Sequence, residues 1–315
     1  MEGSGPLRVV ALLALAVMAA APRAAAAQVH PGGHVAQGVW SDADWAVLER
    51  KARWALEAGL DSVPMGDAVA ALGRTFVGTP YVPHTLESGG PEGLVVNFRG
   101  LDCVTFVENV LTLARFVREP DARALLERRR EAERRYETLL AGARYRGGVL
   151  SGYPSRLHYF SDWVGDAQAK GLVRDVTREL GGTLDLEAVD FMSTHPEAYP
   201  QLREDPRNLV EIRAAEARLS ETGRWYLPEA SLERVAPSIR DGDIIAATST
   251  VKGLDVAHTG LALWVGGSLR LMHAPLVGDS VQISEEPLAA RILRIPGQDG
   301  VIVARPCDAR GGGGC

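Results

Sequence analysis

Apolar residues recur at helical spacing through the first two thirds of the chain, which predicts a series of amphipathic helices. Ser41 is a good N-cap for the first of them, and Trp45, Leu48 and Leu56 lie on its apolar side. A charged segment further on carries leucines on one side and interleaves arginine with glutamate, as an exposed helix face does. The expected helices cover about 42–56, 67–72, 102–117, 119–143, a stretch beginning at Asp162, and, broken by prolines, 190–225.

After Gly242 the pattern changes to short apolar runs that are separated by glycine-containing turns. Gly266-Gly267 joins two of these runs and predicts a hairpin. Helices followed by a mostly antiparallel sheet indicate an α+β fold. The expected strands cover 243–247, 256–265, 269–274, 281–284 and 301–304.

The N-terminus has the features of an export signal. Arg8 precedes an apolar run from Val9 to Ala21, and Ala25-Ala26-Ala27 offers a cleavage site. The run is short for a membrane span, and no later segment resembles one. We therefore expect residues 1–27 to be a signal peptide and the mature protein to be periplasmic or secreted, with an uncleaved anchor as the alternative.

Composition restricts the partners. The chain is 46% hydrophobic and 23% charged, which is ordinary for a globular protein. Its net charge of -6 argues against nucleic acid as a partner.

Cys307 and Cys315 flank a glycine-rich tail that could let them pair, or the tail could be unstructured and the cysteines unpaired. Cys103 is the remaining cysteine.

Cys103 directly follows Asp102, a good N-cap, at the start of the helix expected over 102–117. Free backbone N–H groups and the helix dipole favour an anion there, so we expect a lowered thiol pKa and a nucleophile. A buried structural cysteine is the plainer alternative.

Two histidines lie on the strands that Gly266-Gly267 joins. His258 precedes the turn and His273 follows it, so the hairpin makes them near neighbours. One imidazole could accept the thiol proton while the other orients it. The chain has no CxxC or HExxH pattern and no GxSxG, so we expect neither a metal or other cofactor nor a serine nucleophile.

These residues belong to motifs that resemble the NlpC-type cell-wall peptidases of the papain-like fold. The longer stretches 94–108 and 155–163 are similar to the branch described as N-acetylmuramoyl-L-alanine amidase-like. The short motifs are Gly78-Thr79-Pro80-Tyr81, Leu101-Asp102-Cys103, Asp241-Gly242-Asp243-Ile244-Ile245, His258-Thr259-Gly260 and His273-Ala274.

The resemblance implies a papain-like fold with the nucleophile helix packed on the sheet and extra helical insertions. It divides the chain into a signal peptide (1–27), a linker with an N-terminal helix (28–65), an amidase domain (66–306) and a flexible tail (307–315). The implied activity is hydrolysis of the amide between N-acetylmuramic acid and L-alanine in peptidoglycan or muropeptides. Oligomeric state stays open.

The resemblance also assigns roles. Cys103 would be the nucleophile, His258 the base and His273 the orienting residue. Tyr81 would place its hydroxyl near the thiol, beside Asp102. Val104-Thr105 stands where many NlpC-type enzymes have Ser-Gly, which moves the expectation from the dipeptide-cleaving group towards the amidase branch.

The segment 145–163 is expected to shape the substrate cleft. An arginine there could bind a carboxylate, and aromatic rings could stack on a sugar or belong to the core. The alternatives to an amidase are a D,L-endopeptidase or acyltransferase of the same fold, or a wall-binding module without activity. The candidate substrate contacts are Arg156, His158, Tyr159 and Trp163.

Overall fold

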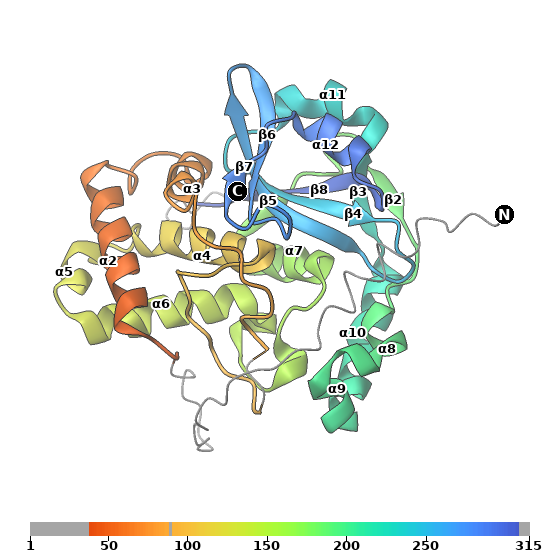
Figure 1. Cartoon of the computed structure of the whole chain (residues 1–315), viewed down its shortest axis with the longest axis horizontal. Coiled ribbons are helices and arrows are strands. Elements are labelled where there is room, and N and C mark those ends of the chain that lie inside the picture. The colour runs from red at the N-terminus through yellow and green to blue at the C-terminus, as the bar shows by residue number, and fades with distance from the viewer. Residues whose placement is uncertain (1–37, 88–89, 309–315) are drawn as a thin grey trace.

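A curved antiparallel sheet with helices against both of its faces forms the centre of the computed structural model, which describes residues 38–87 and 90–308 (Figure 1). The α+β class expected from the sequence is confirmed. The helices are α2 Asp42–Glu57, α3 Met65–Arg74, α4 Cys103–Phe116, α5 Ala122–Leu126, α6 Arg129–Arg144, α7 Phe160–Ala169, α8 Phe191–Thr194, α9 Pro200–Glu204, α10 Pro206–Thr222, α11 Leu232–Val235 and α12 Leu288–Arg294.

The strands follow the order β2-β3-β8-β4-β5-β6-β7, with β1 also paired to β8, and every pairing between them is antiparallel. The five strands expected after Gly242 are confirmed as β4 to β8. The strands are β1 Val173–Asp175, β2 Thr183–Asp185, β3 Arg224–Pro228, β4 Ile244–Ser249, β5 Val256–Val265, β6 Ser268–His273, β7 Gln282–Ile283 and β8 Gln298–Pro306.

Two expectations about elements are corrected. The charged segment 119–143 is two helices, because the backbone of Arg128 leaves the helical region (φ -125°, ψ 70°) between α5 and α6. Strands β1 to β3 were not expected. Two of them have three residues each, too few to show a period of two, and β3 begins inside the stretch predicted to be helical.

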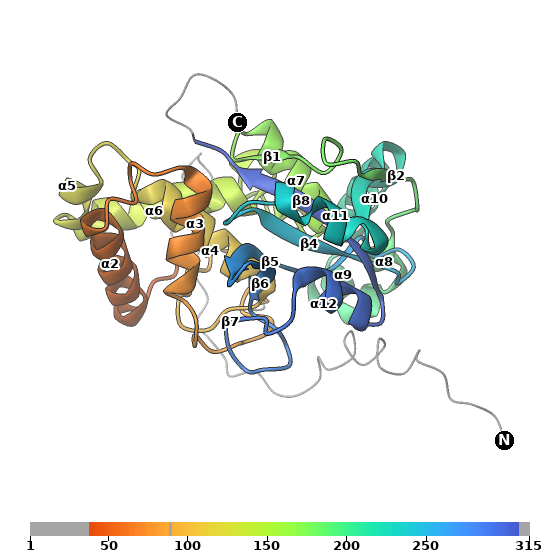
Figure 2. The same ribbon diagram turned by 90° about the horizontal axis from the view of Figure 1, so that it is seen from above.

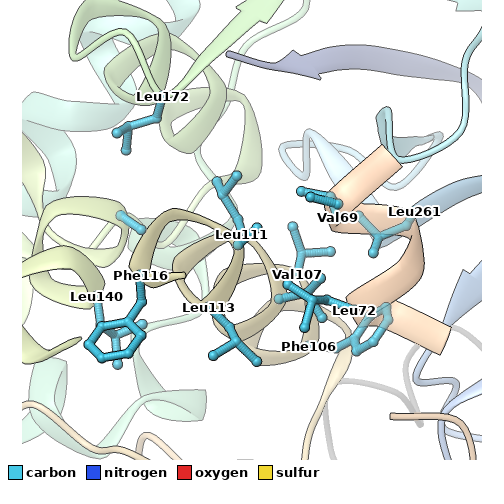
Figure 3. Packing of buried hydrophobic residues seen from close by; sticks show 14 of the residues in the cluster. Val69, Leu72, Phe106, Val107, Leu111, Leu113, Phe116, Leu140, Leu172 and Leu261 are labelled. Atoms are coloured by element: carbon cyan, nitrogen blue, oxygen red, sulfur yellow. The ribbon is translucent and has the colours of Figure 1, made fainter. Parts of the chain in front are cut away.

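Alternate residues of the central strands enter two separate hydrophobic cores. Ile244, Leu261 and Met272 face the larger core, which α2, α3, α4, α6 and α7 complete. Figure 3 shows part of this core, where Phe106, Val107 and Leu111 of α4 lie between Leu72 of α3 and Leu172. Helix α2 therefore packs in the main core, although it precedes the boundary drawn at residue 66.

The other face of the sheet is covered by α11 and α12. Ile245, Ala262 and Leu271 meet Leu288 and Ile292 there. Figure 2 shows these two helices on the side of the sheet away from α4. A third cluster joins α8, α9 and α10 to the loop before α7, so the insertion has a small core of its own.

The expected signal peptide and all but residues 307 and 308 of the expected tail fall beyond the described residues. Cys315 lies in that part of the tail, so its pairing with Cys307 stays a prediction. Within 38–87 and 90–308, no helix is long and apolar enough to cross a membrane. The last described segment is fixed to the core, because Cys307 N–H donates to Leu172 O at 3.0 Å and Arg118 pairs with Asp308 at 2.6 Å.

Candidate active site

The first turn of α4 carries the candidate nucleophile and is closed by a reciprocal capping box. Asp102 Oδ1 accepts from Thr105 N–H at 2.8 Å, and Thr105 Oγ1 accepts from Asp102 N–H at 2.9 Å. Both ends of the box are fixed, so the backbone around Cys103 is rigid at the helix start. The spacing Asp-x-x-Thr is the signal in the sequence that could have identified the role of Thr105.

Cys103 is free and partly exposed as a residue. Its thiol lies on the buried side, against the backbone N–H groups of Thr259, Cys103 and Val104. Burial of the thiol, followed by the charge of Asp102, raises the pKa of Cys103 to about 12. The amides of Thr259, Cys103 and Val104 act in the opposite direction. The expectation of a lowered pKa is therefore wrong for the resting protein, because desolvation of the thiolate outweighs the helix start.

His258 and His273 form a hydrogen-bonded pair across the β5–β6 hairpin. His258 Nε2 lies 2.7 Å from His273 Nδ1, and the two rings are nearly perpendicular at 84°. Register places Leu261 opposite Met272, so Gly260 is opposite His273, and His258 lies two residues earlier in β5. The predicted proximity of the two histidines is confirmed.

Gly260 provides the space for this pair. A Cβ at that position would lie 2.6 Å from Met272 O and 2.9 Å from His273 Cβ. Glycine thus allows β6 to approach β5 closely enough for the two rings to meet diagonally. The N-terminus of α4 approaches β5 at the preceding residue, where the Thr259 amide faces the Cys103 thiol.

Both imidazoles are held in the neutral form. Burial, followed by the positive charge of Arg291, lowers the pKa of His258 to about 3. Burial, then His258, then Arg291 lower the pKa of His273 to about 2. His273 Nε2 is buried and has no hydrogen-bond partner in the described structure. Sequence reasoning missed Arg291, because nothing in its local pattern links α12 to the hairpin.

Tyr81 lies near the candidate nucleophile Cys103. The segments around Tyr81 and Leu101 run parallel, with Val82 N–H donating to Leu101 O at 3.1 Å and Leu101 N–H to Pro80 O at 3.0 Å. Burial raises the pKa of Tyr81 to about 12, and the nearby Cys103 and Asp102 act in the same direction. Its hydroxyl is therefore a neutral hydrogen-bond donor.

The structure brings Cys103 and the histidine pair together through Thr259. Its amide faces the Cys103 thiol, and the next residue back along β5 is His258. The described side chains show no direct hydrogen bond from the thiol to His258. In enzymes without substrate such a bond is often long, and it tightens when substrate binds.

Two of the expected substrate contacts have internal partners. Arg156 is buried and pairs with Glu87 at 2.7 Å and with Glu92 at 3.3 Å, so its charge is already neutralised. His158 Nε2 lies 2.8 Å from Tyr153 O, with its ring against that of Tyr153. These contacts occupy the Arg156 guanidinium and one ring nitrogen of His158, and the substrate contacts expected of the two side chains stay predictions.

The two expected sugar-stacking rings are in the interior. Trp163 is fully buried and stacked on Phe160 at 4.9 Å between ring centroids. Tyr159 is buried, and its hydroxyl donates to Glu216 Oε1 at 2.7 Å and accepts from Met192 N–H at 2.8 Å. Neither ring has a face open to a sugar. Of the two alternatives for these rings, the structure therefore favours a place in the core.

Across 38–87 and 90–308, no three His, Cys, Asp or Glu side chains gather in a way that could hold a metal ion. The chemistry at the helix start is that of a thiol, two neutral imidazoles, a phenol and converging amides. Such a set can form and break an acyl bond through sulfur.

Solved structures resemble this one closely. An N-acetylmuramoyl-L-alanine amidase from Bacteroides uniformis is 35% identical with a TM-score of 0.70, and the match covers 78% of this chain and 99% of that one. A protein from Bacteroides fragilis whose name suggests a xylanase is 36% identical, with a TM-score of 0.68 and coverage of 74% and 98%.

A third similar structure supports the fold alone. It is a Legionella pneumophila protein that is 19% identical, with a TM-score of 0.57 and coverage of 84% of this chain and 97% of that one. Among curated proteins, none matches. The AmiA-like family, described as N-acetylmuramoyl-L-alanine amidase-like, matches residues 71–298, and the chain belongs to that family.

Proposed function

We propose that this protein is an exported cysteine amidase of the papain-like, NlpC-type fold. Its substrate would be the amide between N-acetylmuramic acid and L-alanine in peptidoglycan or muropeptides. The observation that carries the proposal is the hydrogen-bonded His258–His273 pair next to a thiol at a helix N-terminus. The family and the Bacteroides uniformis amidase support the choice of bond.

The resting thiol and imidazole are both neutral, so the proton moves during attack. Cys103 Sγ would bond to the carbonyl carbon of the lactyl group while His258 Nδ1 takes the thiol proton. His258 Nε2–H would donate to His273 Nδ1. This bond fixes the His258 ring and leaves His258 Nδ1 free to accept the thiol proton. His273 is therefore a positioning residue.

The tetrahedral intermediate carries its negative charge on the former carbonyl oxygen. The Cys103 backbone N–H and the Tyr81 hydroxyl are the candidate donors to that oxygen. The carbon–nitrogen bond then breaks, and the amine of L-alanine takes the proton from His258. Water, deprotonated by His258, would hydrolyse the thioester and release the muramic acid carboxylate and the free thiol.

The test is mass spectrometry of the products from a defined muropeptide. Wild type should release a stem peptide that begins with L-alanine, and Cys103→Ala should lower that rate by at least about 1,000-fold, because no nucleophile remains. The Cys103→Ala protein should keep the wild-type circular dichroism spectrum. Stem-peptide release at the wild-type rate by Cys103→Ala would refute the cysteine mechanism.

The same digestion separates the alternatives. Cleavage inside the stem peptide would identify a D,L-endopeptidase, and transfer of the muramoyl group to an added amine would identify an acyltransferase. Binding of the muropeptide without any new product would identify a wall-binding module. Cleavage between sugars would show that the glycosidic bond is the target.

A further inference from the structure

An open hollow lies between α2 and the loops that lead to Tyr81 and Asp102. Its volume is about 370 Å³. The basic residues in its wall are Arg50, Lys51 and Arg99, and no carboxylate lines it. The wall of the hollow is therefore basic, although the net charge of the chain is -6.

The three basic side chains of this hollow differ in whether a carboxylate already pairs with them. Arg99 pairs with the buried Asp44 at 3.1 Å. Lys51 Nζ bonds to neutral oxygens, Thr75 O at 2.5 Å and Thr75 Oγ1 at 3.0 Å. Arg50 is exposed and has no carboxylate partner in the described chain. The field inside the hollow is therefore positive.

Lys51 is also partly buried. Its ammonium lies over the Phe76 ring, 4.0 Å from the centroid. Burial, followed by the charge of Arg50, lowers the pKa of Lys51 to about 8, so the amine is still mostly charged at pH 7. An anion in the hollow would relieve the repulsion between Lys51 and Arg50.

The hollow adjoins the two loops that lead to the candidate site residues. Its wall includes Pro80 and Arg99, and the Pro80 carbonyl accepts from Leu101 N–H, two residues before Cys103. Three extended peptide residues span roughly 10 Å. A stem peptide that leaves the candidate site in this direction could therefore bring a side-chain or terminal carboxylate to the hollow.

We propose that the hollow is a subsite for a carboxylate on the peptide side of the substrate; this rests on the proposed function. The lactyl carboxyl of muramic acid is the acyl part of the amide to be cleaved. The muramic acid residue therefore carries no free carboxylate in the substrate. The remaining carboxylates of a muropeptide belong to its peptide. A positive subsite thus selects substrates by their peptide, and Arg50 is the exposed cation of the hollow, without a carboxylate partner among the described residues.

The experiment compares two muropeptides that differ only in the peptide, one with free carboxylates and one with carboxamides. Arg50→Gln should raise KM for the first about threefold to tenfold, with kcat unchanged, and should leave both constants for the second unchanged. Arg53→Gln is the matched control, because Arg53 lies on the same helix but pairs with Glu49 and Glu127 outside the hollow.

An equal effect of Arg50→Gln on both substrates, or equal effects of Arg50→Gln and Arg53→Gln, would overturn the subsite. If wild type releases no peptide from either muropeptide, the proposed amidase activity is refuted, and this result leaves the subsite to a binding experiment. Titration calorimetry of Cys103→Ala with the two free stem peptides then tests the subsite. Tighter binding of the carboxylate form, lost in Cys103→Ala/Arg50→Gln, supports it, and equal binding of the two forms refutes it.

Discussion

Gly260 lies on β5, and one added carbon there would collide with β6, the strand that carries His273. Gly260→Ala would place a methyl 2.6 Å from Met272 O, a backbone atom that cannot rotate away. We expect β6 to move, the free energy of unfolding to fall by about 1–3 kcal/mol, and the His258–His273 bond to lengthen. The measurements are urea unfolding and kcat on a muropeptide.

Gly165→Ala is the control for Gly260→Ala. Gly165 lies within α7, and a Cβ there has no neighbour within 4 Å. Alanine should stabilise that helix by up to about 1 kcal/mol and leave kcat unchanged. Equal unfolding midpoints and equal kcat for wild type and Gly260→Ala would show that the close approach of the strands is not required.

At the scale of elements, a buried ion pair joins α4, which carries Cys103, to its neighbour α6. Glu108 of α4 accepts from Arg144 of α6 at 2.7 Å, and both side chains are 2% exposed. Arg144 also donates to Val95 O at 2.6 Å. The pair therefore ties α4 to α6 and to the loop that precedes Cys103.

Removal of one partner should cost more than removal of both. Glu108→Leu leaves a buried guanidinium without its carboxylate, and we expect the free energy of unfolding to fall by about 3–5 kcal/mol. Glu108→Leu/Arg144→Met replaces both charges with apolar groups and should recover most of that loss. Urea unfolding of the single and double variants measures the difference. A double variant less stable than Glu108→Leu would contradict this account.

Periodicity predicted the long elements and missed the short ones. Helices α2 and α4 and the hairpin of β5 and β6 have enough residues to show their periods, so their ranges are close to those expected. Strands β1 and β2 are held by pairing with distant strands, which no local pattern contains. The break between α5 and α6 follows from a single backbone rotation at Arg128.

The candidate site was predictable where residues meet through local geometry. The hairpin alone brings His258 to His273, and an N-cap alone places Cys103 at a helix start. The burial of Trp163 and the pairing of Arg156 with Glu87 and Glu92 depend on tertiary packing. A local sequence pattern cannot distinguish a buried aromatic or arginine from one that faces a cleft.

At the scale of the whole molecule, neutral buried histidines link stability to pH. Burial, followed by Arg156, lowers the pKa of His158 to about 3, and His258 and His273 are lowered similarly. Below an ordinary histidine pKa of about 6.5 the unfolded chain takes up protons that the native protein does not. The free energy of unfolding should therefore fall as pH falls from about 6.5.

The expected loss is on the order of several kcal/mol between pH 6.5 and pH 4.5. His258→Gln/His273→Gln should flatten the dependence, whatever its stability at pH 7, because two of the proton-binding differences are gone. Urea unfolding at half-unit pH steps gives both slopes. Identical slopes for wild type and the double variant between pH 6.5 and 5 would show that the histidines are not the cause.

The contact between the Cys103 thiol and the Thr259 amide has a consequence for when the protein becomes reactive. The histidine pair can form early, because both rings belong to one hairpin. The thiol reaches that hairpin only after the chain between α4 and β5 has folded, and closing such a long loop is slow. A partly folded chain would therefore hold Cys103 and His258 apart, so any reaction that needs both side chains would wait for the final folding step.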